Sequence, residues 1–292
     1  MGSRFRRGVA LGAYGLSAAL SRFDPETYDD VEVFCAFLGY SRSGHSFIAS
    51  MLDAHPNMAI AMEVDALRMV ELGADRRTLF KALTMRSAFM ARVRRNRWSG
   101  YDYAVPGGHQ GRWERLRVIG DKQGRRTLTR IHEKPQLLDR LRDTIQCELR
   151  LLHVIRNPFD SIATMHNRHH SVTKASSRAG TEGVVLPDLL DKKIAAYFLQ
   201  CRRMEEVRTT CKLEILDIHQ EAYLAEPISG LAMIIEFLGL GASDEYVQRC
   251  ASVTLTEPRR SRFSIEWPPG SIASVRSHMR DFETLSRYDF DT

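Results

Sequence analysis

The sequence predicts an α/β fold in which one domain is built on a central parallel sheet with helices on both faces. Short apolar runs recur along the chain, and each is followed by polar or helix-starting residues. After residue 31 no repeat, low-complexity block or long linker rich in Pro, Gly or Ser divides the sequence. Apolar strands that alternate with helices are typical of a parallel sheet, whose ligands bind at the carboxyl ends of the strands.

The elements can be placed in order. VEVFCAFLGY (31–40) reads as a buried strand, and GHSFIASMLDAHP (44–56) reads as a helix that stops before its proline. Further strands are expected at MAIAM (58–62) and in LRVIGDK (116–122), ELRLLHVIRNP (148–158) and KLEILDI (212–218). A helix can start at Pro158, because proline lacks an N–H that the first helical turn would leave unpaired. ISGLAMIIEFLGL (228–240) predicts a helix that ends at a glycine.

Composition narrows the class of protein. A chain of 292 residues with 43% hydrophobic and 27% charged residues is typical of a soluble globular protein. The net charge of +6, carried mostly by arginine, favours an anionic ligand. The five cysteines form no C-x-x-C pair, which predicts reduced thiols and a cytoplasmic location. The basic run RVRRNRW (92–98) belongs to no recognised nucleic-acid-binding module, so we expect no nucleic-acid partner.

Residues 1–30 differ from the domain predicted for residues 31–292. The basic SRFRR precedes the apolar run GVALGAYGLSAAL, which is too short and too rich in glycine to span a bilayer. We expect an interfacial or docked helix, with a cleaved signal and disorder as the alternatives. Residues 1–23 could then make a peripheral contact with a membrane surface.

GYSRSGHS (39–46) predicts an anion-binding loop. It fits the spacing G-x-x-x-x-G-K-[ST] except that His45 replaces the lysine. Such a loop offers backbone N–H groups and a positive helix end to a phosphate, and Arg42 adds a permanent cation. VIGD (118–121) is only a weak candidate for the strand that would supply a magnesium ligand. The loop therefore suits transfer of a group less highly charged than a phosphoryl group; an accidental strand-turn-helix is the alternative.

Read onward, GYSRSGHSFIASMLDAHPNMAIAME resembles the sulfotransferase family, which opens with a pattern like G-x-x-[RK]-[ST]-G-[TS]-[TS]. The resemblance implies a single P-loop-like domain that binds 3′-phosphoadenosine-5′-phosphosulfate (PAPS) as sulfuryl donor. MLDAHP and the glutamate after MAIAM look particularly like the tyrosylprotein sulfotransferases and their bacterial relatives. The resemblance implies donor contacts from Arg42, Ser43, Gly44, His45 and Ser46, although His45 departs from the family's usual Thr or Ser.

A second anchor lies in LLHVIRNPFDSIATMHNR (151–168). In the sulfotransferases a strand-end arginine and a serine eight residues later hold the 3′-phosphate of PAPS, and the corresponding positions here are Arg156 and Thr164. Arg168 resembles a further phosphate contact. The segment EPRRSRFSIEWPPGSI (257–272) is interpreted as a lid over the nucleotide, with a basic solvated loop as the alternative. As a lid it would place Arg259, Arg260 or Arg262 near the 3′-phosphate; the sequence does not choose among the three, and Arg260 is the candidate carried forward.

The resemblance also assigns the chemistry. Glu63, which follows the strand-like MAIAM, matches the general base of the tyrosylprotein branch, and Lys122 matches a lysine that contacts the bridging oxygen. Arg42 and Lys122 would share the charge that develops on the leaving group. The usual proline after this lysine is replaced by QGRR. No metal is required in this chemistry, and the histidines 166, 169 and 170 lack the carboxylate or cysteine partner that a zinc site needs.

The sequence thus predicts a PAPS-dependent sulfotransferase that works by in-line, metal-independent transfer. A P-loop phosphoryl-transfer enzyme and a non-catalytic nucleotide-binding module are the alternatives. The acceptor stays open among a protein tyrosine, a sugar, a lipid headgroup and a small metabolite, because donor-site motifs constrain the acceptor little.

Overall fold

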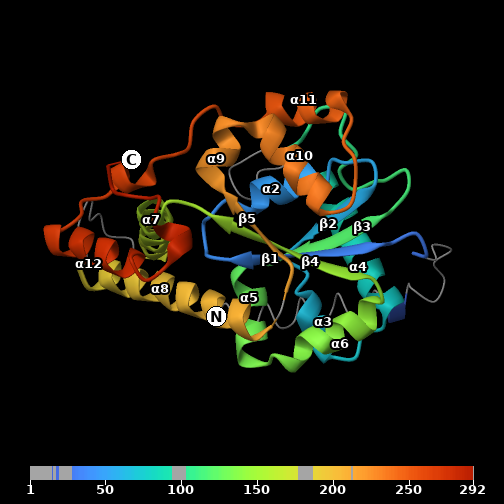
Figure 1. The fold of residues 1–292 in the computed structure, drawn as a ribbon, viewed down its shortest axis with the longest axis horizontal. Helices are drawn as coiled ribbons and strands as arrows, with labels where there is room; N and C mark the ends of the chain where they lie inside the picture. Colours follow the sequence, from blue (N-terminus) through green and yellow to red (C-terminus); the bar gives the residue numbers. More distant parts are fainter. Residues whose placement is uncertain are drawn as a thin grey trace.

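A five-stranded parallel sheet forms the centre of the protein (Figure 1). The computed structural model describes residues 28–93, 103–176, 187–211 and 213–291, together with 15, 18 and 19. The strands are arranged in the order β2-β3-β1-β4-β5, and every neighbouring pair is parallel. Their bounds are β1 Val33–Gly39, β2 Met58–Met62, β3 Val118–Lys122, β4 Glu148–Ile155 and β5 Ile215–His219. All five expected strands and the predicted fold class are confirmed.

The register brings the carboxyl ends of the strands to one edge of the sheet. Met62 pairs with Lys122 across β2 and β3, and Gly39 pairs with Val154 across β1 and β4. Residues that directly follow β1, β2 and β4, and the last residue of β3, therefore lie along this edge. In a parallel sheet this is the edge at which ligands bind.

One face of the sheet is covered by four helices (Figure 1). They are α2 His45–Leu52, α9 Gln220–Ala225, α10 Pro227–Phe237 and α11 Asp244–Ser252. Alternate residues of β1 and β4, such as Phe37 and Leu152, are fully buried here against Ile48 of α2 and Ile234 of α10. The expected helix after β1 and the helix that ends near Gly239 are both present.

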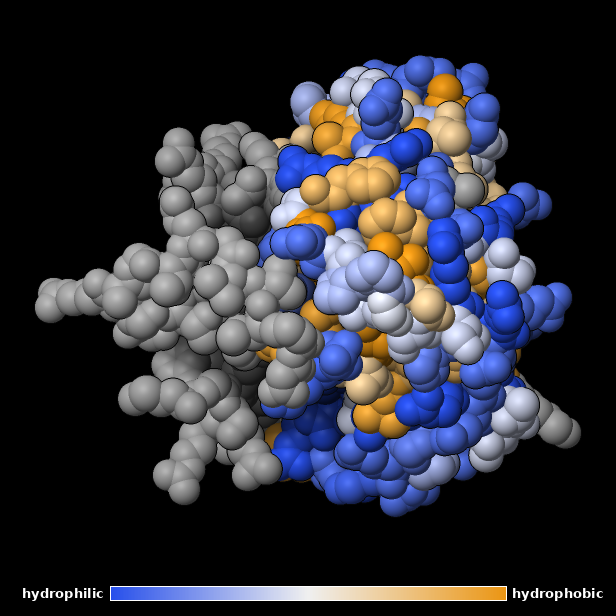
Figure 2. Space-filling model, turned by 90° about the vertical axis from the view of Figure 1, so that its left-hand side faces the viewer, coloured by the Kyte–Doolittle hydropathy of each residue, from blue (hydrophilic) through white to orange (hydrophobic). Residues whose placement is uncertain are grey.

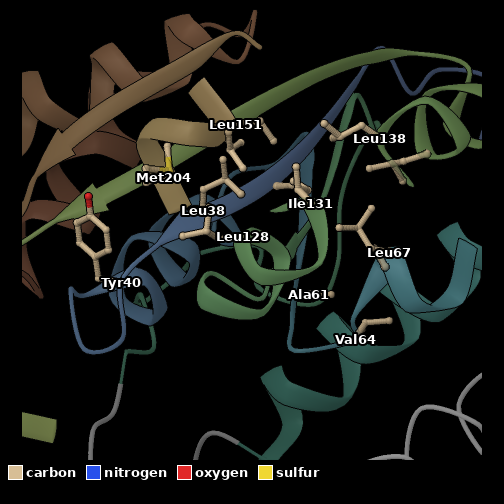
Figure 3. Close-up of a cluster of buried hydrophobic side chains, with 14 of the residues drawn as sticks. Leu38, Tyr40, Ala61, Val64, Leu67, Leu128, Ile131, Leu138, Leu151 and Met204 are labelled. Carbon is tan, nitrogen blue, oxygen red and sulfur yellow. The ribbon is translucent and has the colours of Figure 1, made fainter. Parts of the chain in front are cut away.

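The other face carries the larger set of helices. They are α3 Ala66–Glu71, α4 Arg76–Val93, α5 Arg125–Glu133, α6 Gln136–Ile145, α7 Pro158–Ser176, α8 Pro187–Thr210 and α12 Pro269–Met279. Figure 3 shows Leu38 and Leu151 of the sheet packed with Leu128 of α5 and Met204 of α8. Each such buried side chain contributes about 1.5–3 kcal/mol to stability, so this layer holds the helices firmly on the sheet.

The chain returns to the sheet edge near its C-terminus. The short helix η2, Ser261–Ser264, packs on α7, and η3 covers Glu283–Leu285. On the face that carries α12 and this segment, apolar residues are scattered among hydrophilic ones (Figure 2). Among the residues that the structure describes, no helix is both long enough and apolar enough to cross a membrane. Residues 1–14 and 20–27, to which the proposed membrane contact largely belongs, lie outside the described residues.

Candidate active site

The loop between β1 and α2 has the conformation that its glycines require. Gly44 has φ +99°, and a Cβ atom there would lie 2.7 Å from Nε2 of Gln220. Arg42 is exposed and also adopts a left-handed conformation, with φ 71°. The Phe47 and Ile48 N–H groups donate to the Gly44 carbonyl oxygen, at 3.0 Å and 3.4 Å. The N–H groups of His45 and Ser46 lie in the first turn, before any carbonyl of the helix can accept from them, and they are the ones suited to an anion. The predicted strand-loop-helix turn is therefore present, and its binding of a phosphate stays a prediction.

The His45 side chain faces the protein interior. Burial lowers the pKa of His45 to about 3, so the ring is neutral. Its Nε2 donates to the Leu38 carbonyl oxygen at 2.7 Å, and Nδ1 lies 3.1 Å from the Ser43 hydroxyl. Cβ atoms on Gly39 or Gly124 would lie only 3.4 Å or 3.2 Å from the ring. The resemblance implies a contact between His45 and PAPS; because both ring nitrogens are engaged inside the protein, such a contact would have to come from the backbone N–H.

Glu63 and Lys122 meet at the edge of the sheet. Glu63 directly follows β2 and has a left-handed φ of 60°, while Lys122 is the last residue of β3. The Lys122 Nζ atom lies 3.2 Å from Oε1 of Glu63, and the Glu63 N–H donates to the Lys122 carbonyl oxygen at 3.1 Å. The Lys122 side chain is 9% exposed and the Glu63 side chain 60% exposed. A buried ammonium group thus orients a carboxylate that solvent and substrate can reach.

Asp121 is fully engaged by the backbone. Its Oδ1 accepts from the Val64 N–H at 3.1 Å and its Oδ2 from the Ala66 N–H at 2.9 Å. Burial raises the pKa of Asp121 to about 6, against the opposing effect of these two hydrogen bonds. The sequence offered Asp121 as a weak candidate for a magnesium ligand; the structure instead directs both of its oxygens to the loop that carries Glu63.

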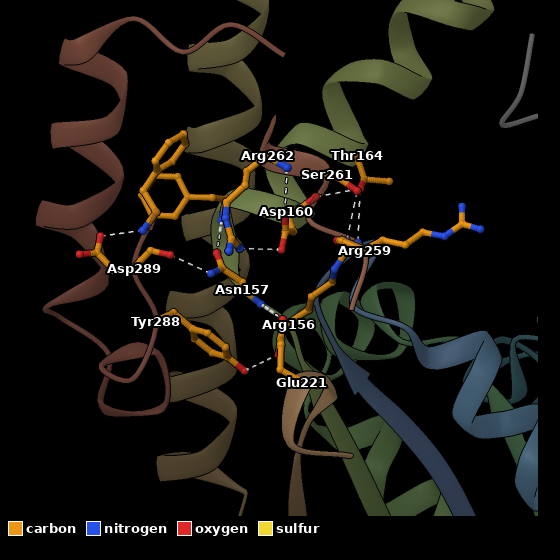
Figure 4. Close-up of polar contacts among 12 residues, drawn as sticks. Arg156, Asn157, Asp160, Thr164, Glu221, Arg259, Ser261, Arg262, Tyr288 and Asp289 are labelled. Carbon is orange, nitrogen blue, oxygen red and sulfur yellow. Dashed lines mark hydrogen bonds and ion pairs between the residues drawn. The ribbon is translucent and has the colours of Figure 1, made fainter. Parts of the chain in front are cut away.

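Arg156 forms the second anchor, at the end of β4 (Figure 4). It is buried, and its Nη1 donates at 3.3 Å both to the Arg42 carbonyl oxygen and to Oγ1 of Thr164. Its Nη2 donates to the Arg259 carbonyl oxygen and, at 3.2 Å, to the Ser261 hydroxyl. Arg156 therefore joins the phosphate loop, helix α7 and the C-terminal segment at one point.

The three C-terminal arginines that the sequence could not rank have different surroundings. Arg262 is buried and donates to Oδ2 of Asp160 at 2.9 Å, while its N–H donates to Oδ1 at 2.8 Å. Arg259 extends its side chain away from this cluster in Figure 4. Arg260 lines a cavity of about 340 Å³ next to Asn157 and Asp160. Arg262 lines the same cavity but is held by the Asp160 carboxylate, so Arg260 is the one of the three that is better placed to meet a ligand here.

The same cavity lies at the carboxyl ends of β4 and β5. Its walls are formed by residues of four segments: Asn157, Asp160, His219, Glu221, Ala222, Pro258, Arg260, Arg262, Arg287 and Tyr288. Glu221 fixes one wall, because its Oε1 accepts from the Asn157 N–H at 2.8 Å and its Oε2 from the Tyr288 hydroxyl at 3.0 Å. Arg262 is paired with Asp160, so Arg260 and Arg287 are the arginines of the lining that suit this cavity to an anionic group.

The predicted residues lie along the sheet edge in the order of the strands: Glu63 after β2, Lys122 on β3, the Arg42–Ser46 loop after β1, and Arg156 after β4. Thr164 joins Arg156 from α7. The side chains of Arg168, His169 and His170 lie outside the described residues. The contacts that sequence reasoning missed include those of Asp121 with the Glu63 loop and of Ser261 with Arg156. The position of Asp121 directly before Lys122 was the available signal for the first; for the second there was none.

This arrangement is suited to transfer of a group from an anionic donor. An exposed carboxylate can accept a proton from an incoming hydroxyl or amine. A buried lysine beside it, with a loop of backbone N–H groups, can stabilise negative charge on the group that leaves. Among the described residues, no three or more His, Cys, Asp or Glu side chains are placed to hold a metal ion.

A comparison with family models and solved structures bears on this site. The model described as the sulfotransferase family matches residues 36–244. Sulfotransferase STF9 from Mycobacterium avium is similar over 94% of this chain and 84% of its own, at 12% identity and a TM-score of 0.53. No curated protein sequence matches the chain.

Two other solved structures are also similar. The sulfotransferase domain of the Synechococcus PCC 7002 olefin synthase covers 87% of this chain and 96% of its own, at 16% identity and a TM-score of 0.49. Mouse sulfotransferase SULT7A1 complexed with PAP covers 91% of this chain and 88% of its own, at 13% identity and a TM-score of 0.47. The similarity to STF9 is a similarity of fold.

Proposed function

We propose, because this chain belongs to the sulfotransferase family, that it moves the sulfuryl group of PAPS to an acceptor hydroxyl or amine by in-line transfer at the carboxyl edge of its sheet. One observation carries the assignment of the catalytic residues. The Glu63 carboxylate and the Lys122 ammonium lie 3.2 Å apart on neighbouring strands, next to the anion-binding loop on β1.

In this proposal Glu63 is the general base. The acceptor oxygen or nitrogen attacks sulfur and gives its proton to the Glu63 carboxylate, while the bond between sulfur and the bridging oxygen of PAPS breaks. The bridging oxygen leaves with adenosine 3′,5′-bisphosphate (PAP), and Lys122 and Arg42 stabilise its charge. The exposure of Glu63 supports this role, because the acceptor must reach the base from solvent.

The donor would be held by the loop and by the Arg156 anchor. Backbone N–H groups of the Ser43–Ser46 segment suit the 5′-phosphosulfate, and Arg156 with Thr164 suits the 3′-phosphate. Arg260 and the adjoining cavity of about 340 Å³ supply further positive charge on the same side. Arg168 remains a proposed contact to this phosphate. Since Arg156 already donates to Arg259 and Ser261, binding of the phosphate would rearrange these contacts.

Membership in the family implies an acceptor, and its chemical class stays open in this proposal. Contact of residues 1–23 with a membrane surface, from a cytoplasmic location, is a further proposal that rests on their basic and apolar composition. Flotation of the protein with anionic liposomes, with and without residues 1–23, tests it. Equal flotation of the two proteins would contradict the proposal.

Calorimetric titration with PAP, beside ATP with magnesium and beside adenosine 5′-monophosphate, tests the donor assignment. We expect PAP to bind much more tightly than either competitor, because it alone carries both the 5′- and the 3′-phosphate. Binding of ATP with magnesium and no binding of PAP would return the chain to the phosphoryl-transfer alternative.

A further inference from the structure

The loop that follows β2 has a strained backbone. Glu63 and Asp65 both adopt left-handed conformations, with φ of 60° and 70°. Each such residue costs on the order of 1–3 kcal/mol unless it is glycine, and the conformation persists only where the surroundings hold it. The strain lies at the residue to which we assign the base, so the groups that hold the loop also hold the Glu63 carboxylate.

Contacts from three elements hold this loop. Asp121 on β3 accepts from the N–H groups of Val64 and Ala66 at 3.1 Å and 2.9 Å. From α5, Arg130 donates twice to the Asp65 carboxylate, at 2.8 Å each. From α4, the Arg86 side chain donates to the Met62 carbonyl oxygen at 2.8 Å. Asp121 alone among these partners binds the peptide group directly after Glu63, and it is also the neighbour of Lys122.

We infer that Asp121 is a positioning residue, which holds the Glu63 carboxylate beside Lys122 by binding the N–H groups of Val64 and Ala66; this inference rests on the proposed role of Glu63. Asp121 does not touch the reacting atoms. It acts on both partners, because its backbone continues into Lys122 while its side chain fixes the loop that carries Glu63.

The positioning requires an ionised Asp121. Both oxygens accept a hydrogen bond, and protonation would convert one of them into a hydroxyl that no longer suits an N–H donor. Burial raises the pKa of Asp121 to about 6. The two backbone hydrogen bonds and the Lys122 charge lower this pKa, whereas the Asp65 charge raises it. Asp65, whose charge raises the pKa of Asp121, is itself paired with Arg126 and Arg130 of α5. Asp121 is therefore about half ionised near pH 6; the two contacts approach completion as the pH rises above this value and weaken as it falls below.

Asp53 provides a matched control. It is also a buried carboxylate, and its Oδ1 accepts from the Ile60 N–H of β2 at 2.8 Å and from the Ser87 hydroxyl at 2.7 Å. It therefore holds β2, the strand that leads into the loop 63–66, but contacts no residue of that loop in these bonds. A general loss of stability should follow from Asp53→Asn as well as from Asp121→Asn, whereas loss of base positioning should follow from Asp121→Asn alone.

The test combines turnover, donor binding and amide hydrogen exchange. Turnover is followed as conversion of PAPS to PAP, with water alone and with p-nitrophenol as acceptor. We expect turnover of the wild-type protein to fall as the pH drops through about 6, which gives the pH profile an acid limb. Asp121→Asn should lower kcat roughly 10- to 100-fold, leave the Kd for PAP within about two-fold, and remove this acid limb. The Val64 and Ala66 amides should exchange faster in this variant, and in the wild-type protein at pH 5 after correction for the intrinsic rate.

Four outcomes would overturn the inference: unchanged kcat in Asp121→Asn, an equal kcat loss in Asp53→Asn, an acid limb that persists in Asp121→Asn, or protection of the two amides that does not change between pH 7.5 and pH 5. The last measurement uses the wild-type protein, so it decides even if the variant fails to fold. Failure of the wild-type protein to bind PAP would instead overturn the proposed function, and this result is distinct from the four outcomes above.

Discussion

The Lys122 ammonium and the Glu63 carboxylate, 59 positions apart in the chain, lie 3.2 Å from each other because β2 and β3 are neighbouring parallel strands. The register that pairs Met62 with Lys122 sets this distance. A base and a cation that have different roles in the proposed transfer are thus held as one unit.

Replacement of Glu63 by Gln should abolish turnover and spare donor binding. The amide keeps the shape of the side chain but cannot accept the proton, so we expect kcat to fall by about 10²-fold or more. The PAP affinity, measured by calorimetry, should change little. Glu236→Gln, an exposed change on α10, is the control. Full turnover in Glu63→Gln would remove Glu63 from the mechanism.

Replacement of Arg156 by Ala should weaken PAP binding. The guanidinium makes charge-assisted hydrogen bonds, worth about 1.5–3 kcal/mol each, which predicts a loss of at least ten-fold in affinity. Lys should rescue little, because it lacks the planar fork. Arg280→Ala, an exposed change at the end of α12, serves as the control in the same titration. An unchanged Kd for PAP would place the 3′-phosphate elsewhere.

Replacement of Gly44 by Ala should damage the loop, because alanine is strained at this φ and the Gln220 side chain would have to move. A Cβ there would lie 2.7 Å from the Gln220 side chain, in addition to the strain of φ +99°. Gly73 has a similar φ of +91° with no atom within 4 Å of an added Cβ, so Gly73→Ala measures the backbone cost alone. We expect PAP affinity to fall in Gly44→Ala and not in Gly73→Ala. Equal PAP affinities in the two variants would show that the loop around Gly44 tolerates a side chain at this position.

Loss of Arg262 should destabilise the fold. Arg262 and Asp160 form a buried ion pair, and burial raises the pKa of Asp160 against the lowering effect of its partners. Arg262→Met removes the guanidinium from Oδ2 of that carboxylate and keeps only the backbone N–H bond of residue 262 to Oδ1, which should lower the free energy of unfolding by roughly 3–5 kcal/mol. The double variant Asp160→Asn, Arg262→Met should recover part of the loss. Urea unfolding measures both, and a single variant as stable as the wild-type protein would refute the prediction.

The buried His45 should make stability depend on pH. Its pKa is lowered to about 3 in the folded protein, against an ordinary value of 6.5. Between these values the unfolded chain binds the proton and the folded protein does not, so stability rises with pH across this window, by up to about 1.4 kcal/mol per unit. His45→Gln should flatten this slope between pH 4 and 6.5 in urea unfolding. A slope identical to that of the wild-type protein would show that His45 does not contribute.

The strands and the two anchors could be predicted because they are local patterns. Apolar runs identify β1, β3, β4 and β5, and glycine spacing identifies the loop at Gly39–Ser46. The same reasoning placed Glu63 and Lys122 each at a strand end. It could not assign Asp121 to the Glu63 loop, because that contact depends on which strands are neighbours.

The sequence by itself determined the fold class, the loop and the type of residue at each strand end, since these follow from residue order and backbone preference. Only the tertiary structure decided that His45 faces inward, that Arg262 is paired with Asp160 while Arg260 lines the cavity, and that Asp121 holds the base loop. Each of these depends on burial and on contacts between segments far apart in the chain, and neither is encoded in local spacing.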